Sequence, residues 1–368
     1  MTSEAAHQAD RAAAQPRPAS ASGRLVVLDA LRGIAALCVV LHHETSYHKA
    51  AEIVPCGYLA VDFFFLLSGF VLTSVFESRL AQGTPPLRLL AERVARLGPI
   101  MAIGIGIGAA AFASHAGTAD AIMMMAMALM LIPHLAGTGA IYPVNGPMWS
   151  LAFELVANAA HVFVLNRLRD WQLGVIVAGF GVGLVYATFT VGRMAFGDMT
   201  DNWWFGFCRI GFSYPLGVLL GRWHRTARRT WHVSWTIPVA LLPAILVFAP
   251  LVPRVIGDLV IAMLIMPAVL WVSAGTRVPD RAVPAMRWLG GISYPVYALH
   301  VPLFAFTVEL AARAGWQDST AFRIAVVLAI LAVSARLAAS PVAKGIRLAE
   351  TPHRSHPQSP AIPGPANG

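Results

Sequence analysis

Long apolar runs, separated by short and often basic connections, dominate this sequence. Several runs approach or exceed the roughly 18 residues that a helix needs to cross a bilayer. They are continuous and do not alternate, which favours membrane helices over barrel strands. The sequence therefore predicts an all-α integral membrane protein, a polytopic bundle of about ten transmembrane helices. The expected spans are about 26–44, 57–77, 98–113, 148–166, 172–190, 205–221, 236–252, 255–274, 289–311 and 322–340.

One further apolar segment, residues 121–135, is short for a span and contains Pro133. If it crossed, the arginine cluster near residues 222–229 would lie outside the cell. If it does not cross, every basic connection faces the cytoplasm, as the positive-inside bias prefers: 78–97, 166–171, 222–234 and 276–288. We therefore expect a short re-entrant or interfacial segment here, with both chain termini in the cytoplasm.

The composition supports one membrane domain between two polar tails. Only 12% of the residues are charged, whereas soluble domains carry about a quarter. Residues 1–23 and the Pro-rich residues 343–368 are expected to be disordered cytoplasmic tails around a membrane domain at 24–342. The net charge of +9 comes from the connections, so it indicates a multi-pass inner (plasma) membrane protein and no nucleic-acid partner. The three cysteines show no metal-ligand spacing, and we expect neither a metal nor a permanently bound cofactor.

The first apolar run has ionisable residues at both ends. Asp29 and Arg32 stand at its start, and His42, His43 and Glu44 stand at its end. Arg32 and His43 are eleven residues apart, so on a helix they share a face at a separation of roughly 16 Å. This spacing suits a long ligand with an anionic head and a reactive tip. The alternative is that Arg32 snorkels to the interface while the histidines end a membrane helix.

Two carboxylates, Asp62 and Glu154, lie within expected spans. A carboxylate in a membrane helix is costly and usually faces protein or water, so function is the default hypothesis. His43 could accept the proton of a hydroxyl group, and a nearby carboxylate could orient its ring. The candidates for this carboxylate are Asp62, Glu154 and also Glu44. The alternative for Asp62 and Glu154 is a structural ion pair with a buried arginine, either Arg32 or Arg209.

Basic residues precede the third expected span. Arg93 and Arg96 are three positions apart, so they share a helix face, and with Arg88 they could bind phosphates on the cytoplasmic side. The alternative is charge that only sets the topology. Three glycines follow within the span, where they favour close helix packing over nucleotide binding: Gly104, Gly106 and Gly108.

Four ordered sequence blocks share a pattern with a known family. They are residues 28–36 followed by His43, residues 61–70, residues 93–96 with Pro99, and residues 149–154; a weaker fifth block is 289–300. Over about 25–310 the chain resembles the membrane-bound acyltransferase family 3, O-acyltransferases of sugars and other hydroxylated acceptors.

The resemblance implies transfer of an acyl group, acetyl or another short chain, from cytoplasmic acyl-CoA to a hydroxyl. The acceptor would be a glycosidic molecule such as a surface polysaccharide, a glycolipid or a macrolide-type product. The resemblance assigns catalysis to His43, supporting roles to Arg32, Asp62 and Glu154, and donor binding to Arg93 and Arg96, with the pantetheine arm passing Arg32. Candidates for contact with the substrate are Asn145, Trp149, Ser150, Tyr294 and His300.

A transporter or flippase is the competing hypothesis. It would use the same buried charges as a substrate path without chemistry, and polytopic architecture alone does not separate the two. An inverted repeat with broken helices would favour transport, and we find none in the sequence.

Overall fold

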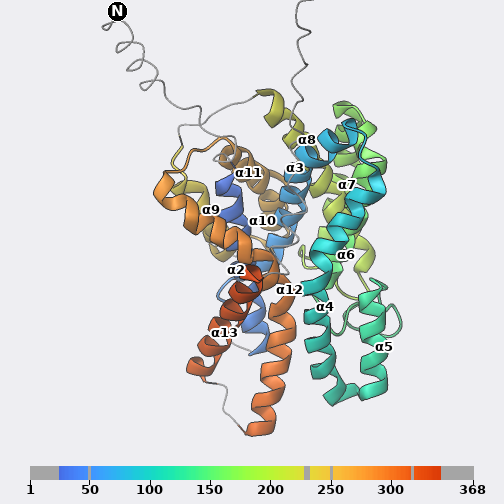
Figure 1. The fold of residues 1–368 in the computed structure, drawn as a ribbon, viewed down its shortest axis with the longest axis vertical. Coiled ribbons are helices and arrows are strands. Elements are labelled where there is room, and N and C mark those ends of the chain that lie inside the picture. The colour runs from blue at the N-terminus through green and yellow to red at the C-terminus, as the bar shows by residue number, and fades with distance from the viewer. Residues whose placement is uncertain (1–24, 49–50, 228–232, 249–251, 316–318, 341–368) are drawn as a thin grey trace, which may run out of the picture.

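The computed structural model describes the membrane domain. The described residues are 25–48, 51–227, 233–248, 252–315 and 319–340, so both expected tails lie outside them. These residues form a helical bundle, and the β-type pairing among them is one isolated bridge between Ala140 and Met199 (Figure 1). The predicted all-α class is thereby confirmed.

The helices keep the order of the apolar runs. They are α2 (Val26–Tyr47), α3 (Ala60–Ala81), α4 (Pro86–Ala116), α5 (Thr118–Leu129), α6 (Met148–Phe163), α7 (Asp170–Val191), α8 (Gly206–Ala227), α9 (Thr236–Phe248), α10 (Arg254–Val260), α11 (Met266–Ala274), α12 (Val283–Ala314) and α13 (Thr320–Ala339). A π-helical turn, Ile261–Ile265, joins α10 to α11 into one nearly continuous helix.

Eight helical segments of the described chain are long and apolar enough to cross a membrane, so the expected count of ten is not confirmed. Two of the expected spans fall short for different reasons. Helix α8 has 22 residues, but it includes charged side chains such as Arg209 and Arg222, and it packs inside the bundle against α3 and α7. The described part of helix α9 has 13 residues, a length of about 20 Å, and residues 249–251 of this expected span lie outside the described residues.

Helix α4 starts much earlier than the sequence suggested. It begins at Pro86, where a proline at the first helical position costs no hydrogen bond, and residues 82–85 alone separate it from α3. The expected loop at 78–97 is therefore wrong, and Arg93 and Arg96 lie on the helix. The sequence suggested a loop because this part of α4 is polar, and it is polar because it lines an internal cavity, described below.

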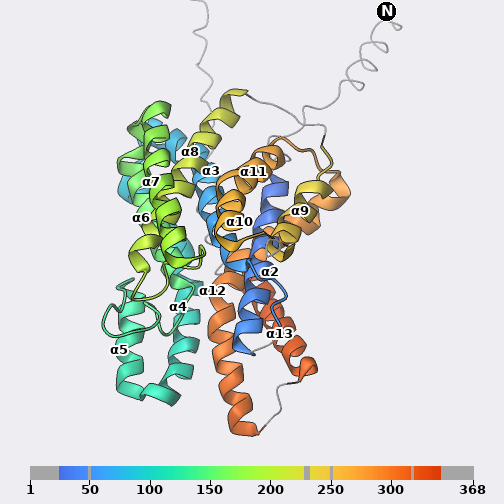
Figure 2. The same cartoon turned by 180° about the vertical axis from the view of Figure 1, so that it is seen from behind.

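The segment at 121–135 folds back along α4. After Gly117, whose φ of 90° reverses the chain, α5 runs for 12 residues, or about 18 Å. This is far below the roughly 30 Å of a hydrocarbon core. Figures 1 and 2 show α5 beside the lower half of α4, and α6 starts again from the lower part of the bundle. The geometry agrees with a short segment that does not span.

Glycines bring the central helices together. A Cβ atom at Gly33 of α2 would lie 2.6 Å from the carbonyl oxygen of Leu289 in α12, and one at Gly290 would lie 2.6 Å from the Cβ of Asp29. In the same way, a Cβ at Gly217 of α8 would lie 2.1 Å from the carbonyl oxygen of Leu66 in α3. The close packing of α2 against α12 and of α3 against α8 therefore requires glycine at these positions, as membrane helix interfaces often do.

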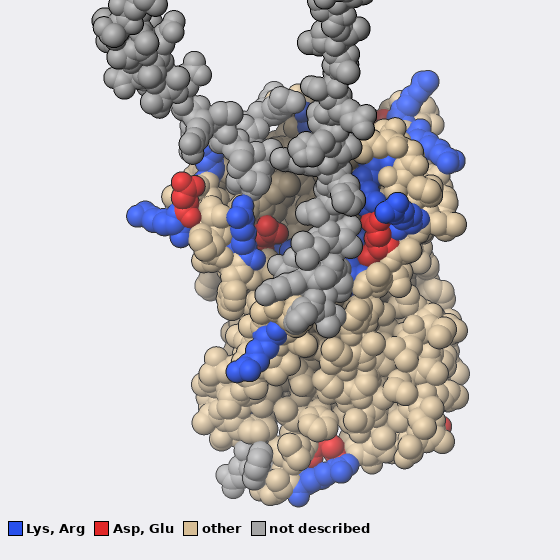
Figure 3. Space-filling view, in the orientation of Figure 1, with Lys and Arg blue, Asp and Glu red and all other residues tan. Residues whose placement is uncertain are grey.

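Charged side chains gather at one end of the molecule. On the face shown in Figure 3, Lys and Arg lie mainly in the upper part, and the lower part is almost uncharged down to a small group at its tip. At the basic end, Arg222 of α8 lies 2.6 Å from Glu77 of α3 and donates to the carbonyl oxygens of Leu165 and Leu168 after α6. The connections predicted to share one side of the membrane are thus in contact.

The glycines of α4 provide a matched stability test. Gly108→Ala places a Cβ 1.7 Å from the carbonyl oxygen of Val144, whereas Gly106→Ala meets nothing within 4 Å. Overpacking of this kind costs about 1–3 kcal/mol. We expect Gly108→Ala to lower the melting temperature of the detergent-purified protein by several degrees and Gly106→Ala to leave it unchanged. Equal melting temperatures for the two variants would contradict this packing.

Candidate active site

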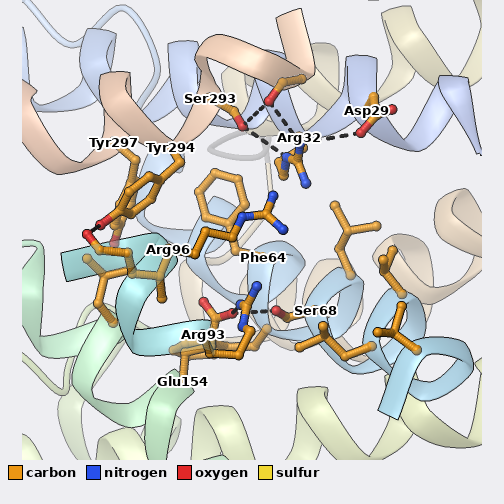
Figure 4. A pocket seen from close by; sticks show the side chains of 18 of the residues that line it. Asp29, Arg32, Phe64, Ser68, Arg93, Arg96, Glu154, Ser293, Tyr294 and Tyr297 are labelled. Carbon is orange, nitrogen blue, oxygen red and sulfur yellow. Dashed lines mark hydrogen bonds and ion pairs between the residues drawn. The ribbon is translucent and has the colours of Figure 1, made fainter. Parts of the chain in front are cut away.

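A cavity of about 620 Å³ lies between α2, α3, α4, α6 and α12. This volume is within the range of ligand pockets, about 300–1,000 Å³. Its lining combines charged and polar side chains with aromatic rings, several of which Figure 4 shows. We call it the arginine-lined cavity, because its wall includes Arg32, Arg79, Arg93, Arg96 and Arg287.

Arg32 is held at the cavity wall by α12. Its Nε donates to Ser293 Oγ at 2.9 Å and one terminal nitrogen donates to the carbonyl oxygen of Gly290 at 2.8 Å. The same terminal nitrogen lies 3.3 Å from Asp29 on the preceding turn. The contact is possible because Gly33 and Gly290 let the two helices approach closely. Arg32 therefore joins the first and fifth sequence blocks and has a fixed orientation.

Glu154 belongs to a second polar cluster on the opposite wall. Its Oε1 accepts a hydrogen bond from Arg93 at 2.8 Å and another from Ser68 Oγ at 2.5 Å. Arg93 and Glu154 are 13% and 14% exposed, so the ion pair is largely shielded from solvent. Arg96 points into the cavity between Arg32 and Arg93 (Figure 4). Three guanidinium groups thus converge on one space.

Phe64, Ser150 and Tyr297 form one part of the cavity wall. The Tyr297 hydroxyl lies 2.6 Å from Ser150 Oγ, and the Tyr297 and Phe64 rings meet edge to face with centroids 5.3 Å apart. The neighbouring Tyr294 donates its hydroxyl hydrogen to the carbonyl oxygen of Leu97 in α4. We use the name aromatic wall for Phe64, Ser150 and Tyr297.

The histidines lie on the far side of the aromatic wall. His43 Nδ1 lies 3.0 Å from the carbonyl oxygen of Val39 and 3.3 Å from Nε2 of His300. The Tyr297 and His300 ring centroids are 5.8 Å apart, so one layer of side chains separates the cavity from this pair. Helix α2 continues to Tyr47, so His43 lies one turn inside the helix end. His42 instead contacts the carbonyl oxygen of Val54 at 3.0 Å.

Asp62 is bound by an arginine. Both its oxygens accept from Arg209, at 3.1 and 2.7 Å, and both residues are 1% exposed. The remaining Arg209 donors contact the carbonyl oxygens of Phe196 and Tyr58, and the Trp149 ring stacks 5.2 Å from the guanidinium carbon. Asp62 is therefore in an ion pair with Arg209, the alternative that the sequence offered, and does not orient His43. Trp149, a candidate for substrate contact, packs against the guanidinium of this pair.

Two other sequence candidates have structural contacts. Glu44 does not orient His43, because both its oxygens accept from Arg323 of α13, at 2.6 and 3.0 Å. Asn145 donates from Nδ2 to the carbonyl oxygen of Ala298 at 3.1 Å. This carbonyl lacks its usual helical partner because Pro302, four residues later, has no N–H. Glu44 therefore connects α2 with α13, and Asn145 connects the segment before α6 with α12.

Several cavity residues were not singled out from the sequence. Ser68, Ser293 and Tyr297 are ordinary helix residues until α3, α6 and α12 are assembled. The sequence signal that could have identified them was their position inside the blocks 61–70 and 289–300. Polar side chains in a membrane helix need polar partners, so each of these residues could have been expected to contact another helix.

Comparison with known proteins identifies the family. The family model described as an acyltransferase domain matches residues 25–338. The chain therefore belongs to acyltransferase family 3, and with its apolar helices it is a membrane acyltransferase.

Two curated proteins are similar in sequence to this chain. Protein 2 in the picA locus of Rhizobium radiobacter is 33% identical over 183 residues, which is 45% of this chain and 94% of the relative. The exopolysaccharide production protein ExoZ of Rhizobium meliloti (strain 1021) is 25% identical over 281 residues, 73% of this chain and 81% of the relative. No solved structure matches the chain.

Substitution of Asp62 separates stability from chemistry. Asp62→Ala leaves the Arg209 charge buried without its partner, which costs about 3–5 kcal/mol. We expect a large drop in melting temperature, partly restored when Asp62→Leu is combined with Arg209→Met. An Asp62→Ala protein with wild-type melting temperature and no transferase activity would show instead that this carboxylate acts in the reaction.

Proposed function

We propose that this protein transfers a short acyl group from acyl-CoA to a hydroxyl of a sugar-containing acceptor in the membrane of the cell. The observation that carries the proposal is the arginine-lined cavity whose inner wall adjoins His43 and His300. Family membership supports acyl transfer, and the name of ExoZ, an exopolysaccharide production protein, favours a surface polysaccharide as the acceptor.

The cavity suits the donor. The diphosphate and 3′-phosphate of CoA would bind among Arg32, Arg93 and Arg96, since guanidinium groups form strong charge-assisted hydrogen bonds with phosphate oxygens. Glu154, which also accepts a hydrogen bond from Ser68, holds Arg93 in place, which lowers the entropy lost on binding. The thioester end would extend toward the aromatic wall.

We infer the orientation in the membrane from the charge distribution. The arginine-rich end would face the cytoplasm, where acyl-CoA is available and where the positive-inside bias places basic connections. The protein would then be a multi-pass inner-membrane protein with both termini in the cytoplasm, and His43 would lie toward the opposite side. An acceptor could approach His43 from that side while the donor occupies the cavity.

The reaction needs a base near the thioester. His43 would take the proton of the acceptor hydroxyl as its oxygen attacks the thioester carbonyl. The carbon–sulfur bond then breaks, an ester forms, and the departing CoA thiolate recovers the proton from His43. Asp62 and Glu154 take no direct part in this scheme, because Arg209 and Arg93 engage them.

Replacement of the base tests the chemistry. We expect His43→Ala to lower kcat by at least about 100-fold, the usual contribution of a general base. The measurement is CoA release by protein in nanodiscs, from acetyl-CoA and a panel of exopolysaccharide oligosaccharides. The matched control is His42→Asn, which keeps a donor for the Val54 carbonyl and should retain activity. Full turnover by His43→Ala would refute the proposed role, and donor movement across the membrane without ester formation would favour a transporter.

A truncated donor tests the cavity. Arg96→Gln should raise the KM for acetyl-CoA about tenfold or more, because a hydrogen bond to a charged group contributes about 1.5–3 kcal/mol. The same variant should use acetyl-N-acetylcysteamine, which has the thioester but no phosphates, as well as wild type does. An equal loss with both donors would show that Arg96 supports the fold and does not bind phosphate.

A further inference from the structure

The tautomer of His300 follows from its surroundings. His300 is fully buried, and its Nδ1 lies 2.8 Å from the carbonyl oxygen of Tyr297 and 3.2 Å from that of Val296. Carbonyl oxygens only accept hydrogen bonds, so the proton of neutral His300 is on Nδ1. Its Nε2 therefore presents a lone pair, and this lone pair faces His43 at 3.3 Å.

The same argument fixes the proton of His43. Its Nδ1 lies 3.0 Å from the carbonyl oxygen of Val39, which again only accepts, and His300 Nε2 is a second acceptor for the same N–H. Neutral His43 therefore carries its proton on Nδ1. The basic lone pair is on Nε2, and the hydrogen bonds of His43 within the described residues use Nδ1 alone.

A base of this kind usually has a carboxylate behind it that selects the tautomer and faces the charge that develops. Here each carboxylate that the sequence offered is paired elsewhere. Glu44 binds Arg323, Asp62 binds Arg209, and Glu154 binds Arg93. The side chain that contacts Nδ1 of His43 is His300. It lies on α12, and its Nε2 accepts the hydrogen bond from His43 of α2.

We propose that His300 is a positioning residue for His43: it holds the proton of His43 on Nδ1, so that Nε2 is the base, and it accepts that hydrogen bond while His43 is charged. This inference rests on the proposed function, in which His43 is the base. It changes the role expected for His300 from contact with substrate to control of the base.

Two substitutions of similar size separate positioning from packing. His300→Gln places an amide oxygen near the position of Nε2, so it can accept from His43. His300→Asn keeps a donor near the position of Nδ1 for the Tyr297 carbonyl but is too short to reach His43. We expect His300→Asn to lower kcat about 10–100-fold, as loss of an orienting partner does, with the KM for acetyl-CoA unchanged. His300→Gln should retain most of the activity.

The other outcomes overturn the proposal. Activity of the Asn variant equal to or above that of the Gln variant would assign His300 to local helix packing, and a raised KM with unchanged kcat would assign it to substrate contact. If both variants misfold, ¹⁵N NMR of the histidine-labelled wild type in nanodiscs decides, with signals assigned by His43→Ala. Protons on Nδ1 of His43 and His300 support the proposal, and a proton on Nε2 of His43 contradicts it. If His43→Ala itself remains active, the proposed function fails before this question arises.

Discussion

The close approach of α2 and α12 is the constraint on which the candidate site depends. Gly33 and Gly290 remove the side chains that would separate the helices. This approach lets Arg32 reach Ser293 and the Gly290 carbonyl at one level of the bundle. Further along the same pair, it places His43 against His300. Arg32, one of the three proposed phosphate-binding arginines, and His43, the proposed base, therefore share one helix interface.

The second organising constraint is the cost of charge in an apolar bundle. Isolated ions are expensive there, and the buried carboxylates Asp62 and Glu44 are each matched with an arginine from another helix. The pairs Asp62–Arg209 and Glu44–Arg323 connect α3 with α8 and α2 with α13. Because these two carboxylates are bound to arginines, Nδ1 of His43 has the neutral side chain of His300 as its partner.

Much of this arrangement could be predicted from single-chain patterns. The apolar runs located most helices within a few residues, and the spacing of Arg32 and His43 correctly placed both on one face, since each contacts α12. The extent of α4 could not be predicted in this way. The polar residues of its first turns face a cavity, and an isolated sequence does not distinguish an internal polar wall from a loop.

Partner choice was the other limit of sequence reasoning. Asp62 and Arg209 are 147 positions apart, and Arg93 and Glu154 are 61 apart. Nothing local in the chain determines which arginine meets which carboxylate. The glycines of α4 show the same limit on a smaller scale: Gly104 and Gly108 each meet a neighbouring backbone as expected, whereas Gly106 meets nothing within 4 Å.

The most direct test of the account is a structure of the protein with a non-transferable acetyl-CoA analogue in which a methylene group replaces the thioester sulfur. The account predicts its phosphates among Arg32, Arg93 and Arg96, and its carbonyl past the aromatic wall. An acceptor hydroxyl placed to attack that carbonyl would then lie within about 3 Å of His43 Nε2. An analogue bound with its phosphates elsewhere, or with its carbonyl remote from His43, would contradict the central claim that the arginine-lined cavity binds the donor beside the base His43.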